Sequence, residues 1–170
     1  MNTLEAILSR RSIRKYTSEP VSDEQIEQLL MAAMHAPSAR NEQPWHFLVI
    51  NNKPLLQAIS NVHPYGKMLR EAPLAIMVCA DENLEPIQGY WAIDCAAATQ
   101  NLLLAAHSLG LGTVWLGIYP REERIKDLRE LTLLPKHIHP VSLIVIGHPD
   151  EIPKQAQRCN SERIRYNFWE

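Results

Sequence analysis

The sequence predicts an α+β or α/β fold in which a small mixed β-sheet is covered by helices. Amphipathic segments with helical periodicity alternate with short apolar runs along the whole chain. The run at residues 74–79 is continuously apolar, as in a strand that is buried on both faces, and residues 141–146 are expected to form a last buried strand. No linker, internal repeat or low-complexity stretch divides the 170 residues. One domain spanning residues 1–170, with a substantial core, is therefore expected.

Capping residues mark the first two helices. Asn2 or Thr3 can begin a helix that carries apolar residues at positions 4, 7 and 8. Ser22 and Gln25 have the spacing of a capping box, and an apolar helical face follows them. Because Pro37 disfavours helical backbone in the residue before it, the second helix is expected to end there.

The rest of the chain alternates strands and helices. Pro54 and Pro120 suit the first turns of two helices, since that position needs no backbone N–H. A long Ala- and Leu-rich helix is expected from about residue 88 to 109, with Gly110 as its stop. It is apolar nearly all round, which predicts a central or interface position. The expected strands are residues 45–50, 74–79, 112–118 and 141–146, which gives the order helix–helix–strand–helix–strand–helix–strand–helix–strand.

A polar, extended tail is expected over residues 149–170. It ends in Tyr166, Phe168 and Trp169. Large aromatic side chains at the end of a long tail are unusual in a monomer, because they would remain in water. The tail is therefore expected to pack on another subunit.

Composition and charge argue against several functional classes. Apolar residues make up 46% of the chain and charged residues 21%, as in ordinary globular proteins. The net charge of −2 gives no overall attraction to nucleic acid or to an anionic membrane. No apolar stretch reaches the roughly 20 residues of a membrane span. Cys79, Cys95 and Cys159 are far apart and form no CxxC motif, so a reducing cytoplasm is the expected location.

The sequence shows no motif for metal binding or nucleophilic catalysis. His137 and His139 have the spacing of one strand face, but flanking prolines and the lack of a carboxylate or cysteine cluster favour loop histidines. Neither GxSxG nor a Ser–His–Asp order is present. We therefore predict no metal site and no catalytic side chain. An enzyme with this sequence would take its chemistry from a cofactor.

A basic cluster stands out against the neutral background. Arg10, Arg11 and Arg14 surround Ser12 at the end of the first helix. Guanidinium groups and a hydroxyl are the donors that a phosphate prefers. Two alternatives stay open. The arginines can complement the helix dipole at a solvated helix end, or, less favoured because aromatic residues are sparse, they can bind nucleic acid.

A polar turn follows the second helix directly. Asn41 and Gln43 offer side-chain amides that donate and accept hydrogen bonds, which suits the alternating donors and acceptors of an isoalloxazine edge. Pro37, Ser38 and Asn41 are also common turn formers, so a purely structural turn remains an alternative.

Residues 110–117 hold three glycines around Trp115. Glycine lets a backbone approach a flat ligand closely. The segment is neither a GxGxxG motif after a strand nor a phosphate-binding P-loop. A helix C-cap followed by a buried strand accounts for part of the pattern in any case.

Together these segments resemble the FMN-dependent nitroreductase family. The matching motifs, in the family's order and spacing, are RRSIR (residues 10–14), APSARNEQPW (36–45), GLGTVWLG (110–117) and GHP (147–149), the last followed by basic residues of the tail. Each motif is weak by itself, but four in order are specific. The resemblance covers nearly the whole chain, which would be a compact member of the family.

The resemblance implies a nitroreductase-like α+β fold and an intertwined homodimer that exchanges C-terminal tails, with two FMN sites at the interface. The implied phosphate and ribityl contacts are Arg10, Arg11, Ser12 and Arg14, completed by Arg158, with Lys154 as a second candidate. The implied isoalloxazine contacts are Pro37, Ser38, Ala39 and Asn41 of the other subunit, while Val114, Trp115 and Gly117 would lie along the flavin.

The activity that the resemblance implies is ping-pong hydride transfer. NADH or NADPH reduces FMN, and a nitroaromatic, quinone or similar small acceptor takes the electrons. Residues 62–70 and 82–91 are expected to border the substrate, where Tyr65, Tyr90 and Trp91 either stack on an aromatic acceptor or belong to the core or interface. The alternatives are a flavin-binding module without NAD(P)H turnover and an anion- or nucleic-acid-binding protein.

Overall fold

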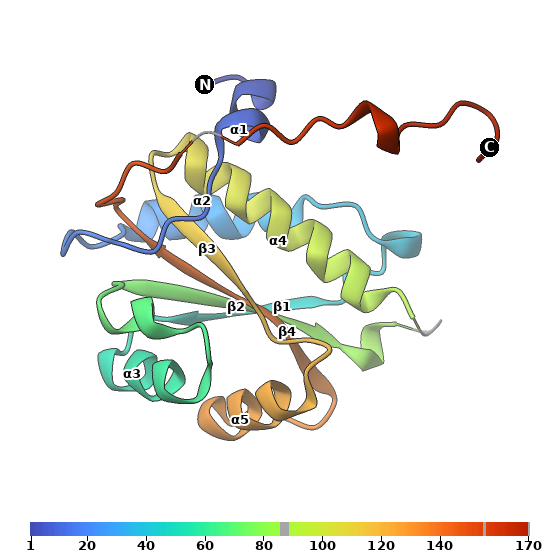
Figure 1. Cartoon of the computed structure of the whole chain (residues 1–170). Helices are drawn as coiled ribbons and strands as arrows, with labels where there is room; N and C mark the ends of the chain where they lie inside the picture. The colour runs from blue at the N-terminus through green and yellow to red at the C-terminus, as the bar shows by residue number, and fades with distance from the viewer. Residues whose placement is uncertain (86–88, 155, 170) are drawn as a thin grey trace.

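A four-stranded sheet lies between two layers of helices in the computed structural model, which describes residues 1–85, 89–154 and 156–169 (Figure 1). The strands are β1 (Trp45–Ile50), β2 (Leu74–Asp81), β3 (Gly112–Gly117) and β4 (Ile138–Gly147). The helices are α1 (Thr3–Ser9), α2 (Asp23–Met34), α3 (Lys53–Val62), α4 (Trp91–Ser108) and α5 (Glu122–Thr132), with short 3-10 turns η1 (Ala39–Asn41), η2 (Lys67–Arg70), η3 (Glu82–Leu84) and η4 (Ser161–Arg163). The predicted α+β class and the predicted order of elements are confirmed.

The sheet differs in one respect from the mixed sheet that the sequence predicted. Its order is β1-β2-β4-β3, and all three strand pairs are antiparallel. Within the described residues, parallel pairing is confined to a single bridge between Ser12 and Thr113. Continuous apolar runs are typical of parallel strands, but here helices cover both faces of an antiparallel sheet, which requires the same pattern.

Two apolar cores form, one on each face of the sheet. Met77 and Leu143 belong to the core under α3 and α5, whereas Ile76 and Ile144 belong to the core under α2 and α4. Neighbouring residues of one strand thus face opposite layers, as the pleat requires. Figure 1 shows α2 and α4 on one side of the sheet and α3 and α5 on the other.

Most helix ends lie where their capping residues predicted. Asn2 and Ser22 both form capping boxes, and Gly110 follows α4 with a φ of 78°, a conformation that suits glycine. The start of α4 that was expected at residue 88 lies outside the described residues, and the helix is described from Trp91. α5 begins at Glu122, two residues after the proline that was expected to open it.

Strand β4 is longer than its apolar run and corrects the loop prediction for His139, whereas His137 lies in the turn before the strand as predicted. It begins at Ile138, so His139 lies in the strand, where its Nε2 is 2.8 Å from a Glu82 carboxylate oxygen. Pro140 pairs with Cys79 where the register of β2 and β4 shifts. A proline has no N–H for the ladder, and the irregularity at this point accommodates it.

The basic segment after α1 runs beside the edge strand β3. The Ile13 N–H donates to the Thr113 carbonyl at 2.8 Å. A Cβ on Gly112 would approach the Ile13 side chain to 2.7 Å, so glycine is what allows the two backbones to lie this close. The contact fixes the arginines on either side of Ile13 at one edge of the sheet.

Candidate functional site

Three arginine side chains gather where α1 ends. Arg10 is the C-cap residue of α1. Burial and then the guanidinium groups of Arg158 and Arg11 lower the pKa of Arg10. The structure therefore brings Arg158, from the C-terminal tail, close to the arginines of the N-terminal segment. Lys154, the second candidate, is not among the groups that lower the pKa of Arg10.

No carboxylate among the described residues forms an ion pair with these arginines. The ion pairs found there join histidines to acids, namely His46 to Asp81, His139 to Glu82 and His148 to Glu19. Arg11 donates from Nη1 to the carbonyls of Leu8 and Arg10, and its buried Nε has no hydrogen-bond partner among the described residues. An unpaired buried donor beside uncompensated positive charge fits an anion.

Arg14 lies apart from this cluster and is exposed. Its backbone N–H and that of Lys15 both donate to the Glu151 carboxylate. Glu151 thus fixes the start of the tail against the basic segment. Glu151 was not predicted as a functional residue, because a position in a polar tail carries no periodic signal that would reveal it.

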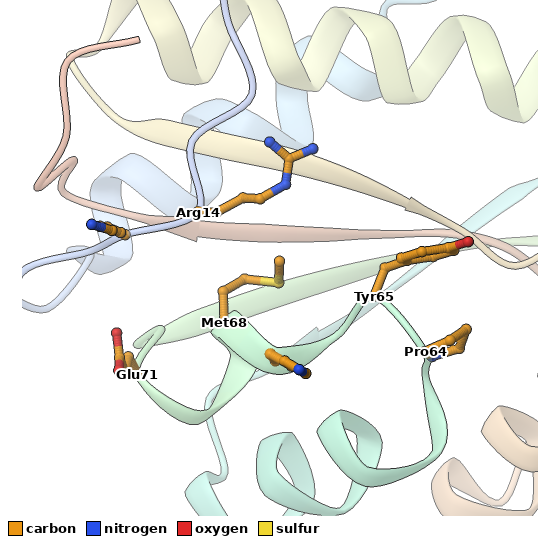
Figure 2. A pocket seen from close by; sticks show the side chains of 7 residues that line it. Arg14, Pro64, Tyr65, Met68 and Glu71 are labelled. Atoms are coloured by element: carbon orange, nitrogen blue, oxygen red, sulfur yellow. The ribbon is translucent and has the colours of Figure 1, made fainter.

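A cavity of about 560 Å³ opens beside Arg14 (Figure 2). Its lining residues are Arg14, Lys15, Pro64, Tyr65, Lys67, Met68 and Glu71. Residues 62–70 were expected to border a ligand, and Tyr65, Lys67 and Met68 do line this cavity. Lys67 was not singled out, although a lysine directly after Gly66 in a short turn is a signal that could have been used. Glu71, just beyond the expected segment, was also missed.

Strand β3 presents its predicted site residues in different directions. The Val114 side chain belongs to the core under α3 and α5, whereas Trp115 packs against the core under α2 and α4. Gly117, at the end of the strand, has its carbonyl oxygen hydrogen-bonded by Arg124 Nη1 at 2.7 Å and by His63 Nε2 at 3.2 Å. Val114 could therefore meet a ligand only through its backbone.

The loop after α2 has a strained backbone. Arg40, Asn41 and Gln43 have φ values of 51°, 59° and 51°, in the left-handed region that residues other than glycine rarely adopt. Each such residue costs on the order of 1 kcal/mol, and strain of this kind concentrates at functional sites. The expected polar turn at Pro37–Gln43 is thus an unusual one.

Hydrogen bonds hold this loop in its strained form. The Gln43 N–H donates to Ser38 Oγ at 3.0 Å, and Gln43 Nε2 donates to Asn41 Oδ1 at 3.1 Å. The Ala39 N–H donates to a carboxylate oxygen of Asp94, a buried residue in the first turn of α4, at 3.1 Å. The side-chain amide N–H groups of Asn41 take part in none of these contacts and have no hydrogen-bond partner within the loop.

The two predicted halves of the site lie at opposite ends of α4. His107, near the C-terminal end, bonds Ser9 beside the arginine cluster, and Asp94, near the N-terminal end, holds the strained loop. At 1.5 Å per residue, these two helix positions are separated by about 20 Å. Figure 1 shows the end of α1 near one end of α4 and the turn after α2 near the other. One chain does not bring its arginines and its Pro–Ser loop together.

Of the other two aromatic candidates, one is engaged within the chain. The Trp91 ring stacks on His139, with centroids 5.2 Å apart, and meets the Tyr119 ring edge-on at 4.8 Å. Tyr90 is exposed and lines a smaller cavity of about 350 Å³ together with Ala39, Arg40 and Glu42. Trp91 therefore has a packing role, and Tyr90 borders the strained loop.

Residues 1–85, 89–154 and 156–169 contain neither a candidate metal cluster nor a candidate membrane-spanning helix. In these ranges, no group of three or more His, Cys, Asp or Glu side chains is arranged to hold a metal ion. No helix there is long and apolar enough to cross a bilayer.

Comparison with known proteins places the chain in a family. The model of the Nitroreductase family matches residues 7–63 and 53–148. The chain belongs to this family. A protein of Methanothermobacter thermautotrophicus, provisionally named an NADH dehydrogenase/NAD(P)H nitroreductase, is 50% identical over 169 residues, which cover 99% of this chain and 88% of that protein.

Solved structures of nitroreductase-like proteins have the same fold. The crystal structure of a provisionally named NADH dehydrogenase/NAD(P)H nitroreductase from Parabacteroides distasonis is 41% identical, with a TM-score of 0.95 over 99% of this chain and 100% of that chain. A provisionally named nitroreductase from Desulfovibrio desulfuricans, solved in complex with FMN, is 36% identical, with a TM-score of 0.87 over 100% of this chain and 99% of that chain. The nitroreductase-like fold expected from the motifs is confirmed.

Proposed function

We propose that this chain is an FMN-dependent NAD(P)H oxidoreductase that reduces nitroaromatic, quinone or similar small acceptors. The observation that carries the proposal is the arginine cluster, which has no carboxylate to balance it among the described residues and which contains a buried, unpaired Arg11 Nε. The similar protein from Desulfovibrio desulfuricans was solved with FMN, and the one from Methanothermobacter thermautotrophicus is named for NAD(P)H. These likenesses support the same cofactor and electron donor here.

The residues present fit the phosphate of FMN. Arg10, Arg11 and Arg158 would hold the phosphate, since their charges lie close together and lower the pKa of Arg10. Ser12, bridged to Thr113 of β3, and Arg14, beside the 560 Å³ cavity, would follow the ribityl chain. Bound FMN would supply the redox chemistry, taking hydride from NADH or NADPH and delivering electrons to the acceptor.

The isoalloxazine would meet residues from two chains. Gly117 and the backbone of Val114 would lie along it, with Trp115 nearby. Pro37, Ser38, Ala39, Asn41 and Gln43 of a second copy would complete its surroundings. The separation of about 20 Å between the α4 positions that contact the two halves supports this arrangement, because a second copy can bring its loop next to the arginines of the first. No side chain needs to act as a covalent catalyst.

The proposal includes an intertwined homodimer that exchanges C-terminal tails. In the tail, Tyr166, Phe168 and Trp169 are 80–86% exposed, and Ile152 is 98% exposed. Covering such side chains on a second copy would remove them from water, which is favourable. We further propose one FMN-binding domain over residues 1–170. Free cysteines at 79, 95 and 159 support a reducing cytoplasm.

The visible absorption spectrum of the purified protein tests this function. We expect a flavin band after FMN is supplied, and bleaching of that band when NADH or NADPH is added without oxygen. Reoxidation by a nitroaromatic or a quinone should restore it. A band that persists with both donors would contradict the oxidoreductase and leave a flavin-binding module. If no band appears, the arginine cluster binds another anion.

A further inference from the structure

His63 links Tyr65, which lines the 560 Å³ cavity, to Gly117 at the end of strand β3. It follows α3 directly and is 2% exposed. Its Nε2 is 3.2 Å from the Gly117 carbonyl oxygen, and its Nδ1 accepts the Tyr65 N–H at 3.3 Å. A carbonyl can only accept and an amide N–H can only donate, so both contacts require the same neutral tautomer, with the proton on Nε2. Burial and the nearby Arg124 guanidinium both lower the pKa of His63, which favours this neutral form.

Arg124, from α5, contacts the same two residues as His63, namely Gly117 and Tyr65. Its Nη1 donates to the Gly117 carbonyl oxygen at 2.7 Å. Its guanidinium carbon lies 5.5 Å from the centre of the Tyr65 ring, within the range of a cation–π contact. Tyr65 is therefore held through its backbone by His63 and through its ring by Arg124, and both holding groups meet at one carbonyl.

The Tyr65 ring is fixed although it is exposed. It is 67% exposed and lines the cavity. Figure 2 shows its ring, Met68 and Arg14 around one opening. An exposed aromatic side chain normally keeps its rotamer freedom, and fixing it in advance reduces the entropy lost when a ligand stacks on it. The two contacts thus preorganise a flat apolar surface at the cavity mouth.

We infer that Tyr65 selects planar acceptors by stacking on them, and that His63 and Arg124 are positioning residues that hold its ring in place. The inference rests on the proposed function, since the acceptor is defined by it. His63 and Arg124 both donate to the Gly117 carbonyl. Gly117, which is expected to lie along the flavin, and Tyr65, which stacks on the acceptor, are therefore held in fixed relative positions. An aromatic contact of this kind changes affinity by about threefold to tenfold.

The test compares a planar nitroaromatic with ferricyanide, an inorganic acceptor that has no aromatic ring. The variants are Tyr65→Leu, which removes the ring, and Arg124→Gln, which removes the cation above it. Tyr65→Phe keeps the ring, and Arg121→Gln changes an exposed arginine next to the same helix. His63→Gln is a third variant, in which glutamine can still donate a hydrogen bond to Gly117. If this substitution of a buried histidine prevents folding, Arg124→Gln still tests the positioning role. FMN affinity is measured by flavin fluorescence alongside kcat and KM.

We expect Tyr65→Leu, Arg124→Gln and His63→Gln to lower kcat/KM for the nitroaromatic by about threefold to tenfold, mainly through KM. The ferricyanide rates and the FMN Kd should stay within about twofold, and Tyr65→Phe and Arg121→Gln should match the parent. Equal losses for both acceptors, or no loss in Tyr65→Leu, would overturn the inference and leave the proposed function standing. A Tyr65→Leu variant that loses FMN would make Tyr65 a flavin-holding residue instead. A parent protein that neither binds nor reduces FMN would overturn both.

Discussion

The two ends of helix α4 differ in whether the charged side chains beside them are paired within the chain. At the N-terminal end, the buried Glu85 carboxylate accepts the backbone N–H groups of Gly89, Tyr90 and Trp91, and Asp94 accepts that of Ala39. At the C-terminal end, Arg10 and Arg11 lie beside His107 with no carboxylate among the described residues to pair with them. Acids at the start and bases at the end of a helix both suit its dipole. Only the basic end is left for a ligand to neutralise.

The acids at the start of α4 are satisfied within the chain, whereas the arginines at its end keep charge that the proposed anionic ligand would neutralise. Acids that are satisfied by their own backbone hold the strained loop in place. Arginines that repel one another reduce stability slightly until an anion arrives. Changes at the acidic end should therefore affect unfolding, and changes at the basic end should affect ligand affinity.

The largest expected effect comes from mixing two inactive variants. Arg10→Glu disables the basic end, and Asn41→Val disables the loop, because a branched residue disfavours the φ of 59° found there. Each variant alone should lose nearly all NAD(P)H oxidation. After unfolding and refolding as an equal mixture, about a quarter of the parent activity should return, since half of the dimers carry one intact site of two.

A mixture with no more activity than its separate components would contradict the two-chain site. Refolding each variant alone under the same conditions is the control, because it shows how much activity the procedure itself recovers.

Removing one arginine of the cluster should weaken FMN binding without weakening the fold. Arg158→Ala removes a charged donor and is expected to cost about 1–3 kcal/mol, or roughly 5- to 150-fold in Kd. Arg163→Ala is the matched control, since it removes an exposed arginine from the same tail. Fluorescence titration with FMN measures both. An Arg158→Ala protein with the parent's Kd would remove the tail from the cofactor site.

At the acidic end the expected pattern is reversed. Glu85→Ala leaves three backbone donors without their carboxylate and should lower the free energy of unfolding by about 2 kcal/mol. Glu130→Ala, an exposed change on α5, should stay within about 0.5 kcal/mol of the parent. Urea unfolding measures both. Parent-like stability in Glu85→Ala would show that this carboxylate does not hold the end of α4.

The smallest expected effect is on His107. Burial and the Arg10 and Arg11 guanidinium groups lower the pKa of His107 below its ordinary 6.5. The unfolded chain then binds more protons than the folded one as the pH falls through that value, so stability should decline below it and level off below the folded pKa. Titration of the His107 ring by NMR should show a higher pKa in Arg10→Ala than in the parent or in Arg163→Ala. Equal values in all three would contradict the closeness of these charges.

Local signals explain why so much of the fold could be predicted. Strand β1 was expected at residues 45–50 and is found at Trp45–Ile50, and the capping boxes at Asn2 and Ser22 mark their helices. Errors arose where pairing partners decide the outcome. His139 became part of β4 because it pairs with Ala80 across the sheet, which no flanking residue could indicate.

The site was only partly predictable for the same reason. Arg10, Arg11 and Ser12 are adjacent in sequence, so a cluster of donors that suit a phosphate could be recognised directly. Glu151 and Asp94 act across long stretches of chain and have no local pattern. The strain at Arg40 and Gln43 is equally invisible in residue types that tolerate many conformations.

By itself, the sequence determined the order of helices and strands, the family motifs and the types of donor available to a phosphate, because capping, periodicity and charge act between near neighbours. Only the tertiary structure decided that the sheet is antiparallel, that Arg158 returns to Arg10, and that His63 joins Tyr65 to Gly117. It also decided that the arginines and the strained loop lie at opposite ends of α4. Those relations depend on which distant segments pack together, and packing is set by the burial of the whole chain rather than by any short stretch of it.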